Sequence, residues 1–214
     1  MSKLQYSVSI SLDGFVAGPD QSLDNPLGVG GQLLHEWMRE RAAWRDAVGL
    51  EGGVTNASTA VLDRDDEQVG AVIMGRSMFG GGSGPWGDDP WKGWWGENPP
   101  QHLPVFVLTH YARPRLDCEG GTSFEFVTGG IDAALRLARA DADGKDVTVP
   151  GGGTVARQYL AAGLLDEIQL HLVPVLLGDG VRLFDDKELA GTRVEQVDVV
   201  EAPAVTHIRY RMRR

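Results

Sequence analysis

The stretch DVTVPGGGTVARQYLAAG, residues 146–163, decides the fold class. Its first four residues predict a short buried strand, and TVARQYLAAG, residues 154–163, predicts a helix. Three glycines, Gly151, Gly152 and Gly153, join the two. Glycines at such a junction let backbone N–H groups and the positive end of the helix dipole approach an anion closely. The stretch therefore predicts a β–α unit that binds a phosphate, with a tightly packed turn as the alternative.

The composition limits the classes of function. The chain has 214 residues, 42% of them hydrophobic, and a formal net charge of −10. This length suits one large core, and we expect a single domain over residues 1–214. The acidic balance argues against a nucleic-acid partner, and no run of about 18 apolar residues predicts a membrane span. A single cysteine, Cys118, excludes an internal disulfide, and we expect a cytoplasmic protein.

Predicted strands and helices alternate through most of the chain. The predicted strands are residues 4–11, 70–75, 104–109, 122–128, 146–149, 167–177, 192–201 and 204–213. The predicted helices are residues 32–48, about 56–68, 131–141 and 154–163. About eight strands and about four helices in this order predict an α/β fold with a central mixed sheet. Early crossovers imply parallel neighbours, and the last consecutive strands imply an antiparallel C-terminal edge.

The helix expected over residues 32–48 depends on an apolar face. Leu33, Trp37, Ala43 or Trp44, and Val48 follow a helical spacing. For the next helix, Asn56 and Ser58 are alternative N-caps.

A second strand-to-helix junction supports an anion site. In AVIMGRSMF, residues 71–79, a buried strand leads into Gly75, Arg76 and Ser77. An arginine at that point is suited to clamp a phosphate in an acidic protein. The next strand is followed by further polar candidates for the same anion, namely Thr109, His110 and Arg113.

The motifs ISLDGFVAG, VIMGRSMF, VFVLTH, VPGGGTVARQYL and LDEIQLHLVPVLLGDGVRLF follow one another along nearly the whole chain. In this order and spacing the chain resembles the dihydrofolate-reductase-like superfamily. Within that superfamily it is most similar to the reductase domain of riboflavin biosynthesis and its stand-alone bacterial relatives. The resemblance implies one dihydrofolate-reductase-like domain that binds NADPH, often as a homodimer. It also implies a small heterocyclic substrate related to a pyrimidine, a pterin or a flavin precursor.

The resemblance implies roles for particular residues. The pyrophosphate would lie against two groups, Gly151, Gly152, Gly153, Thr154 and Val155, and Gly75, Arg76 and Ser77. The 2′-phosphate would lie among Arg76, Thr109 and His110. The nicotinamide would lie near Val16 and Ala17.

Some positions depart from the family pattern. Met78 stands where dihydrofolate reductases have threonine, and Ser7 stands where the riboflavin reductases usually have lysine. The second departure argues against a phosphoribosylated pyrimidine as the substrate. The candidate catalytic residues are Glu36, beside His35, and Asp13; their alternatives are a solvated helix face and a turn residue.

A coil rich in tryptophan, glycine and proline, at about residues 80–104, forms an insertion. It suits a lid over the substrate, and it equally suits packing onto the sheet or a dimer interface. His102, His171 and His207 fall in unrelated predicted elements, and no spacing indicates a metal site.

Three functions remain open. The first is an NADPH-dependent reductase, similar to 5-amino-6-(5-phosphoribosylamino)uracil reductase or to dihydrofolate reductase. The second is a module that binds NADP(H) or another nucleotide without turnover. The third is a fold used only for assembly, in which the glycines form turns.

Overall fold

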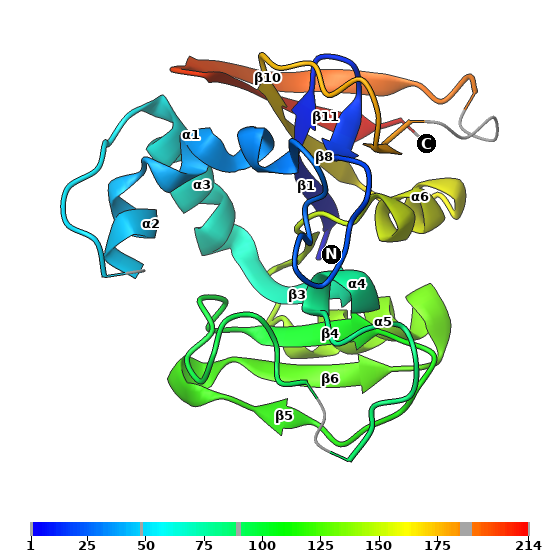
Figure 1. Cartoon of the computed structure of the whole chain (residues 1–214). Helices are drawn as coiled ribbons and strands as arrows, with labels where there is room; N and C mark the ends of the chain where they lie inside the picture. The colour runs from blue at the N-terminus through cyan, green and yellow to red at the C-terminus, as the bar shows by residue number, and fades with distance from the viewer. Residues whose placement is uncertain (1, 48, 89–90, 185–189, 214) are drawn as a thin grey trace. The chain divides into compact units, whose positions relative to one another are not determined.

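The computed structural model describes residues 2–47, 49–88, 91–184 and 190–213 (Figure 1). The chain divides into two compact units. Unit 1 comprises Met1–Tyr6 and Gln68–Leu165, and unit 2 comprises Ser7–Glu67 and Asp166–Arg214. Strand β1, Leu4–Ser11, contributes residues to both.

The strands of unit 1, apart from β5, form the parallel part of a mixed sheet (Figure 1). Their order is β1-β7-β3-β4-β6-β5, with bounds β7 Asp146–Val149, β3 Val69–Gly75, β4 Pro104–Leu108, β6 Ser123–Val127 and β5 Leu116–Asp117. The pairs from β1 to β6 are parallel, as the crossovers predicted, and only β5 pairs antiparallel. The two residues of β5 were not predicted as a strand.

In unit 2, the sheet continues from β1 as β8-β11-β10, and these late strands are antiparallel. Their bounds are β8 Glu167–Val173, β11 Val205–Met212 and β10 Val194–Ala202. The predicted antiparallel C-terminal edge is therefore confirmed. Two short strands, β2 Phe15–Ala17 and β9 Val181–Arg182, pair separately and were not predicted.

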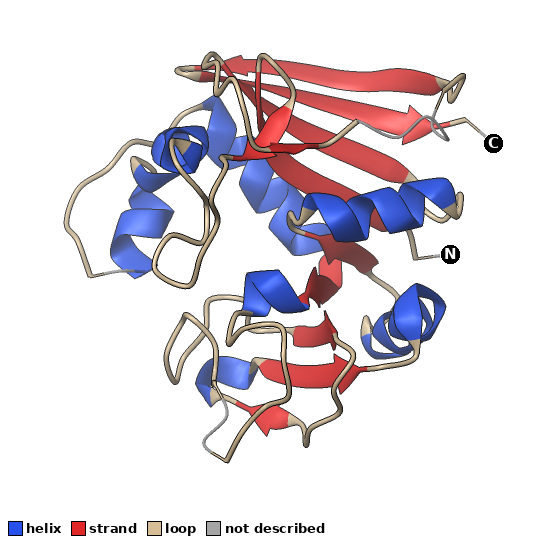
Figure 2. Cartoon of the chain, turned by 45° about the vertical axis from the view of Figure 1, so that its right-hand side comes forward, coloured by secondary structure: helices blue, strands red, loops and turns tan. Residues whose placement is uncertain are grey.

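The described residues contain six α-helices (Figure 2). They are α1 Glu36–Arg39, α2 Ala42–Ala47, α3 Ala57–Gln68, α4 Arg76–Phe79, α5 Gly130–Asp141 and α6 Gly153–Ala161. Two 3-10 helices, η1 Gly31–His35 and η2 Glu119–Gly121, accompany them. Helix α5 buries Ala134, Leu135 and Ala138, as its apolar periodicity predicted. Asn56 caps α3, because its Oδ1 accepts a 2.9 Å hydrogen bond from the Ser58 N–H.

The single helix predicted over residues 32–48 is wrong, since the segment forms η1, α1 and α2 instead. The break occurs where the backbone pairs with Val54. The Val54 N–H donates to the Glu40 carbonyl at 2.8 Å, and the Ala42 N–H donates to the Val54 carbonyl at 3.1 Å. These bonds replace helical hydrogen bonds, so the helix cannot continue through Arg41.

The break also changes the buried face of this segment. Leu33 is 40% exposed, whereas Leu34 and Trp37 are buried against Val173 and Val205. A regular helix would have turned Leu33 inward with Trp37, but the 3-10 turn shifts the register by one residue. Val48 lies outside the described residues.

Candidate functional site

In unit 1, three neighbouring parallel strands, β7, β3 and β4, end at the same edge of the sheet. Gly75, the last residue of β3, is in register with Leu108, the last residue of β4. A Cβ added to Gly75 would lie 2.9 Å from Cγ2 of Val155 in α6. The structure therefore brings together the three segments that the sequence proposed for cofactor binding: Gly151–Val155, Gly75–Ser77 and Thr109–His110.

The junction between β7 and α6 is open. Gly151 and Gly152 have φ of 114° and 76°, which side-chain-bearing residues rarely adopt. A Cβ added to either glycine would meet no described atom within 4 Å. No side-chain hydrogen bond from the described residues caps α6 at Gly152. The Cβ positions of Gly151 and Gly152 therefore face free space at the start of an uncapped nine-residue helix, an arrangement that suits an anion.

The junction between β3 and α4 is closed. Gly75 has a φ of −80°, which any residue adopts, so its need for glycine comes from the contact with Val155. Helix α4 has only four residues, and one turn of helix contributes little dipole. Ser77 is exposed on it. The anion-binding capacity of this junction therefore depends on the Arg76 side chain.

The Arg76 guanidinium folds back over the coil that follows α4. Its Nε donates to the Gly80 carbonyl at 3.1 Å and its Nη2 to the Gly81 carbonyl at 2.9 Å. Its Cζ lies 3.1 Å from the centroid of the Trp86 ring. Burial, and secondly the charge of Arg113, lower the pKa of Arg76. Its Nη1 is buried and has no hydrogen-bond partner among the described residues.

The residues after β4 have different environments. The Thr109 side chain is buried, and its hydroxyl accepts a 3.2 Å hydrogen bond from the Tyr111 N–H. This hydrogen bond stabilises the turn that follows β4. His110 is exposed. Arg113 donates from Nη1 to the Trp91 carbonyl at 2.7 Å.

The tryptophan-rich coil, described over residues 80–88 and 91–103, is attached to the rest of unit 1 by indole hydrogen bonds. Trp91 donates to the Phe79 carbonyl at 2.8 Å, Trp94 to the Met78 carbonyl at 3.0 Å and Trp86 to the Tyr111 carbonyl at 2.8 Å. Trp86 and Trp95 also pack onto a buried cluster that contains Phe79, Phe124 and Phe126. Of the roles left open by the sequence, packing onto the sheet is the one that these contacts support.

In unit 2, Val16 and Ala17 lie in β2 and are buried. Ala17 pairs with Val181 of β9. The proposed nicotinamide contacts of these two residues stay a prediction.

Asp13 holds two loops of unit 2 together. Its carboxylate accepts hydrogen bonds from the Leu177 N–H at 3.1 Å, the Gly178 N–H at 2.7 Å and the Ser11 hydroxyl at 2.5 Å. The hydrogen bond from Ser11, followed by those from the backbone amides, lowers the pKa of Asp13 to about 2. Asp13 is therefore ionised at neutral pH and has no proton to donate, which favours the turn role that the sequence left open.

Glu36, the other candidate catalytic residue, is the first residue of α1 and is exposed. His35 before it is partly buried, and burial lowers the pKa of its imidazole. The catalytic role of Glu36 stays a prediction.

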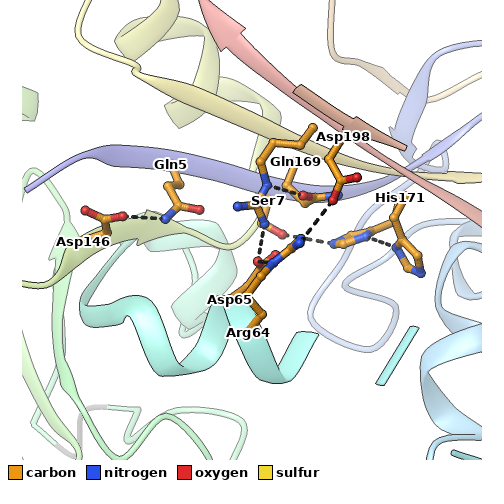
Figure 3. Close-up of polar contacts among 10 residues, drawn as sticks. Gln5, Ser7, Arg64, Asp65, Asp146, Gln169, His171 and Asp198 are labelled. Carbon is orange, nitrogen blue, oxygen red and sulfur yellow. Dashed lines mark hydrogen bonds and ion pairs between the residues drawn. The ribbon is translucent and has the colours of Figure 1, made fainter. Parts of the chain in front are cut away.

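A buried chain of hydrogen bonds crosses unit 2. His171 and His207 are opposite each other in strands β8 and β11, and their Nδ1 atoms are 2.7 Å apart. The chain ends in hydroxyls, because His171 Nε2 is 3.1 Å from Ser7 Oγ and His207 Nε2 is 2.9 Å from Ser58 Oγ. Figure 3 shows Ser7 and His171 at one end of it. Trp37 packs against both rings, with centroids 5.1 Å from each.

Burial keeps this pair neutral. Burial, and secondly the neighbouring His207, lower the pKa of His171 to about 3. Burial lowers the pKa of His207 to about 4, against the opposing effect of Asp65. One Nδ1 must donate and the other accept, which two neutral imidazoles can do. From the sequence, these histidines fell in unrelated predicted elements. The antiparallel pairing of the last strands was the signal that could have indicated that the two residues lie opposite each other.

An ionic cluster lies beside His171 (Figure 3). Asp65 on α3 pairs with Arg209 of β11, which also donates from Nε to Gln169 Oε1 at 2.9 Å. Arg64 pairs with Asp198 at 3.1 Å. The Asp65–Arg209 pair is largely buried, with side chains 13% and 10% exposed.

Across the described ranges, no helix is long and apolar enough to cross a membrane. Among the same residues, no group of three or more His, Cys, Asp or Glu side chains is placed to hold a metal ion.

Comparison with known proteins gives a family. The family model for the RibD C-terminal domain matches residues 2–208, almost the whole chain. Among solved structures, a Shewanella sp. PV-4 protein provisionally assigned to riboflavin biosynthesis has a TM-score of 0.63 at 20% identity, and each chain covers 99% of the other.

Two further structures share the fold. One is the diaminohydroxyphosphoribosylaminopyrimidine deaminase/5-amino-6-(5-phosphoribosylamino)uracil reductase of Thermotoga maritima, with a TM-score of 0.54 at 13% identity; the match covers 99% of this chain and 56% of that one. The other is a dihydrofolate reductase of Enterococcus faecalis in complex with NADP(H), with a TM-score of 0.50 at 13% identity, covering 98% and 96%. These likenesses support the predicted fold class.

Proposed function

The chain belongs to the RibD C-terminal domain family, and from this premise we propose that it is an NADPH-dependent reductase of a small heterocycle. The substrate class is a pyrimidine, a pterin or a flavin precursor. The observation that carries the proposal is the open glycine junction between β7 and α6, where a Cβ at Gly151 or Gly152 would occupy free space. Uncapped helix amides and free space together suit a pyrophosphate.

Different residues of unit 1 would bind different parts of the cofactor. The backbone amides at the start of α6, from Gly152 to Thr154, would bind the pyrophosphate. Val155 would fix the position of these amides, because it packs against Gly75 at the end of β3. Arg76 and the exposed His110 would bind the phosphate on the ribose. A guanidinium distinguishes NADPH from NADH because it forms charge-assisted hydrogen bonds to that extra phosphate.

When bound, NADPH supplies a hydride to an electron-poor carbon of the heterocycle. The protein then has to deliver a proton to the neighbouring heteroatom. Glu36 is the candidate donor that remains, because Asp13 is ionised and its oxygens already accept hydrogen bonds. Ser7, at the family's usual lysine position, favours a substrate other than a phosphoribosylated pyrimidine.

Calorimetric titration with NADPH and NADH tests the cofactor, with two glycine variants of α6. Gly152→Ala adds a methyl group at the N-terminus of α6, where the pyrophosphate would lie. Gly163→Ala is the matched control, since Gly163 also has a positive φ of 65° and free space around its Cβ, but follows the opposite end of the helix. Both substitutions cost about 1 to 2 kcal/mol of backbone strain.

We expect the parent to bind NADPH more tightly than NADH. Gly152→Ala should weaken NADPH binding by at least about tenfold. Gly163→Ala should leave the affinity for NADPH within about twofold of the parent's. Equal weakening by both variants, or no binding by the parent, would contradict the proposal.

A nucleotide-binding module without turnover is the second candidate. The ionised, hydrogen-bonded state of Asp13 favours it, because it removes one of two candidate proton donors. Absorbance of reduced nicotinamide separates the two functions. Oxidation of bound NADPH in the presence of a dihydropterin or aminopyrimidine substrate, lost in Glu36→Gln, supports the reductase; binding without oxidation across such substrates supports the module.

A further inference from the structure

The guanidinium of Arg76 is held by the coil that follows α4. Its Nε donates to the Gly80 carbonyl at 3.1 Å and its Nη2 to the Gly81 carbonyl at 2.9 Å. The Trp86 ring covers one face of the guanidinium, since Cζ lies 3.1 Å from the ring centroid. Nη1 alone has no hydrogen-bond partner among the described residues, and that atom is buried. A phosphate is bound most strongly through two parallel N–H bonds, and in this arrangement Arg76 has no free pair of donors to offer.

The coil keeps the two carbonyls in place. Gly80 and Gly81 have φ of 92° and 78°, which side-chain-bearing residues rarely adopt. A Cβ at Gly80 would lie 2.7 Å from Cε2 of Trp94, and one at Gly81 would lie 2.6 Å from Cβ of Trp91. Both positions require glycine for conformation and for packing. The contact with Arg76 is therefore part of the folded coil and not a chance position of a surface side chain.

The contacts that hold Arg76 include no carboxylate. None of the ion pairs among the described residues contains Arg76 or Arg113. The Cζ of Arg113 lies 4.5 Å from the centroid of the same Trp86 ring, and its charge, after burial, lowers the pKa of Arg76. Carbonyl dipoles and an aromatic ring attract a cation less strongly than an anion does. A phosphate is therefore a stronger partner for Arg76 than the coil is.

We propose that Trp86 and the carbonyls of Gly80 and Gly81 form a latch that competes with NADPH for Arg76. The inference rests on the proposed function, in which Arg76 binds the phosphate on the ribose. NADH lacks this phosphate and does not need Arg76. The latch therefore lowers the affinity for NADPH alone, and Trp86 is a residue that sets how strongly the chain prefers NADPH to NADH.

The test titrates NADPH and NADH against the full chain and two variants of the coil. Trp86→Leu removes the aromatic face and the indole hydrogen bond to the Tyr111 carbonyl, but keeps apolar bulk on the buried cluster that contains Phe79. Trp95→Leu is the matched control. Trp95 lies in the same coil and packs on the same cluster, but its ring stacks on Phe124, with centroids 6.2 Å apart.

Thermal unfolding establishes that each variant is folded. Should Trp86→Leu not fold, Trp86→Phe keeps a ring that attracts a guanidinium less strongly than indole does.

We expect Trp86→Leu to tighten NADPH binding by about threefold to tenfold and to leave NADH binding within about twofold. Trp86→Phe should give a smaller gain for NADPH, and Trp95→Leu should leave the ratio of the two affinities unchanged. Three results overturn the latch while leaving the proposed function intact: NADPH binding that is unchanged or weaker in folded Trp86 variants, equal tightening of both nucleotides, or the same gain in Trp95→Leu. A parent chain that binds neither nucleotide overturns the proposed function, and the latch with it.

Discussion

The two polar regions of the molecule differ in where their hydrogen bonds end. In unit 2, His171, His207, Ser7 and Ser58 donate and accept mainly among themselves. In unit 1, the Cβ positions of Gly151 and Gly152 at the start of α6 face free space, and Arg76 and Arg113 each keep one buried donor without an acceptor among the described residues. The histidine chain satisfies its own hydrogen bonds and so stabilises the fold, whereas the open donors of unit 1 suit an anion; Asp65 Oδ2 and Gln169 Nε2 in unit 2 also lack a partner among the described residues.

This difference separates two kinds of mutational effect. Substitutions in the unit 2 cluster should lower the stability of the fold and leave the intrinsic nucleotide affinity of folded protein unchanged. Substitutions at the open edge of unit 1 should lower nucleotide affinity more than stability. The predictions that follow test this division, beginning with the largest expected effect.

Asp65→Asn should destabilise the protein most. It removes the carboxylate that neutralises Arg209 and leaves a buried guanidinium that is only 10% exposed. Breaking a buried pair by removing one partner costs about 3 to 5 kcal/mol. Urea unfolding measures the loss. The control is Asp117→Asn, whose pair with Arg115 is exposed and should contribute less than about 1 kcal/mol.

An Asp65→Asn variant that unfolds at the same urea concentration as the parent would show that the pair is not a stabilising element. A variant that stays folded and yet loses NADPH binding would contradict the division between the two regions, because the unit 2 cluster would then contribute to nucleotide binding.

The histidine pair should make stability depend on pH. Its imidazoles have folded pKa values of about 3 and 4, below the ordinary value of 6.5. As the pH falls below 6.5, these histidines take up protons in the unfolded chain but not in the folded chain. The stability that the neutral pair contributes is therefore fully present above pH 6.5. It decreases as the pH falls from 6.5 towards the folded pKa values. Between pH 7 and 5 the loss is about 2 kcal/mol for each histidine.

His207→Gln isolates this contribution. Its Nε2 can still reach the Ser58 hydroxyl, but the side chain does not titrate. Urea unfolding at pH 7 and at pH 5 should show that the variant loses about 2 kcal/mol less than the parent over this interval. Equal losses in the two proteins would mean that His207 is not held neutral by the fold.

Much of the fold was predictable because it depends on local patterns. Strand periodicity and the triple glycine placed β1, β7 and α6 within a residue or two, and the crossovers predicted that the early strands have parallel neighbours. The helix over residues 32–48 failed because a distant residue, Val54, takes hydrogen bonds from its middle. Such non-local pairing leaves no periodic signal in the segment that it breaks.

The site was predictable to a different extent. Glycines and an arginine at strand ends identified one sheet edge, since these residue types at a strand-to-helix junction are typical of an anion site. The pairing of His171 with His207 depends on the register of two strands that are 36 residues apart at this point. The stacking of Arg113 on Trp86 depends on the path of a coil with no regular structure. Neither could be found from spacing alone.

The smallest expected effect distinguishes the two glycine junctions at the edge of unit 1. Gly75→Ala should cost about 1 to 2 kcal/mol, because the new Cβ would lie 2.9 Å from Val155 Cγ2 in a buried contact. Val155→Ala removes that methyl group. The double variant should therefore lose less free energy of unfolding than the sum of the losses in the two single variants. A double-mutant cycle measured by urea unfolding gives this coupling. Gly152→Ala should show no coupling with Val155→Ala, since its Cβ meets no described atom within 4 Å. Additive losses for Gly75→Ala and Val155→Ala would mean that Gly75, like Gly152, is kept free for a ligand and not for packing.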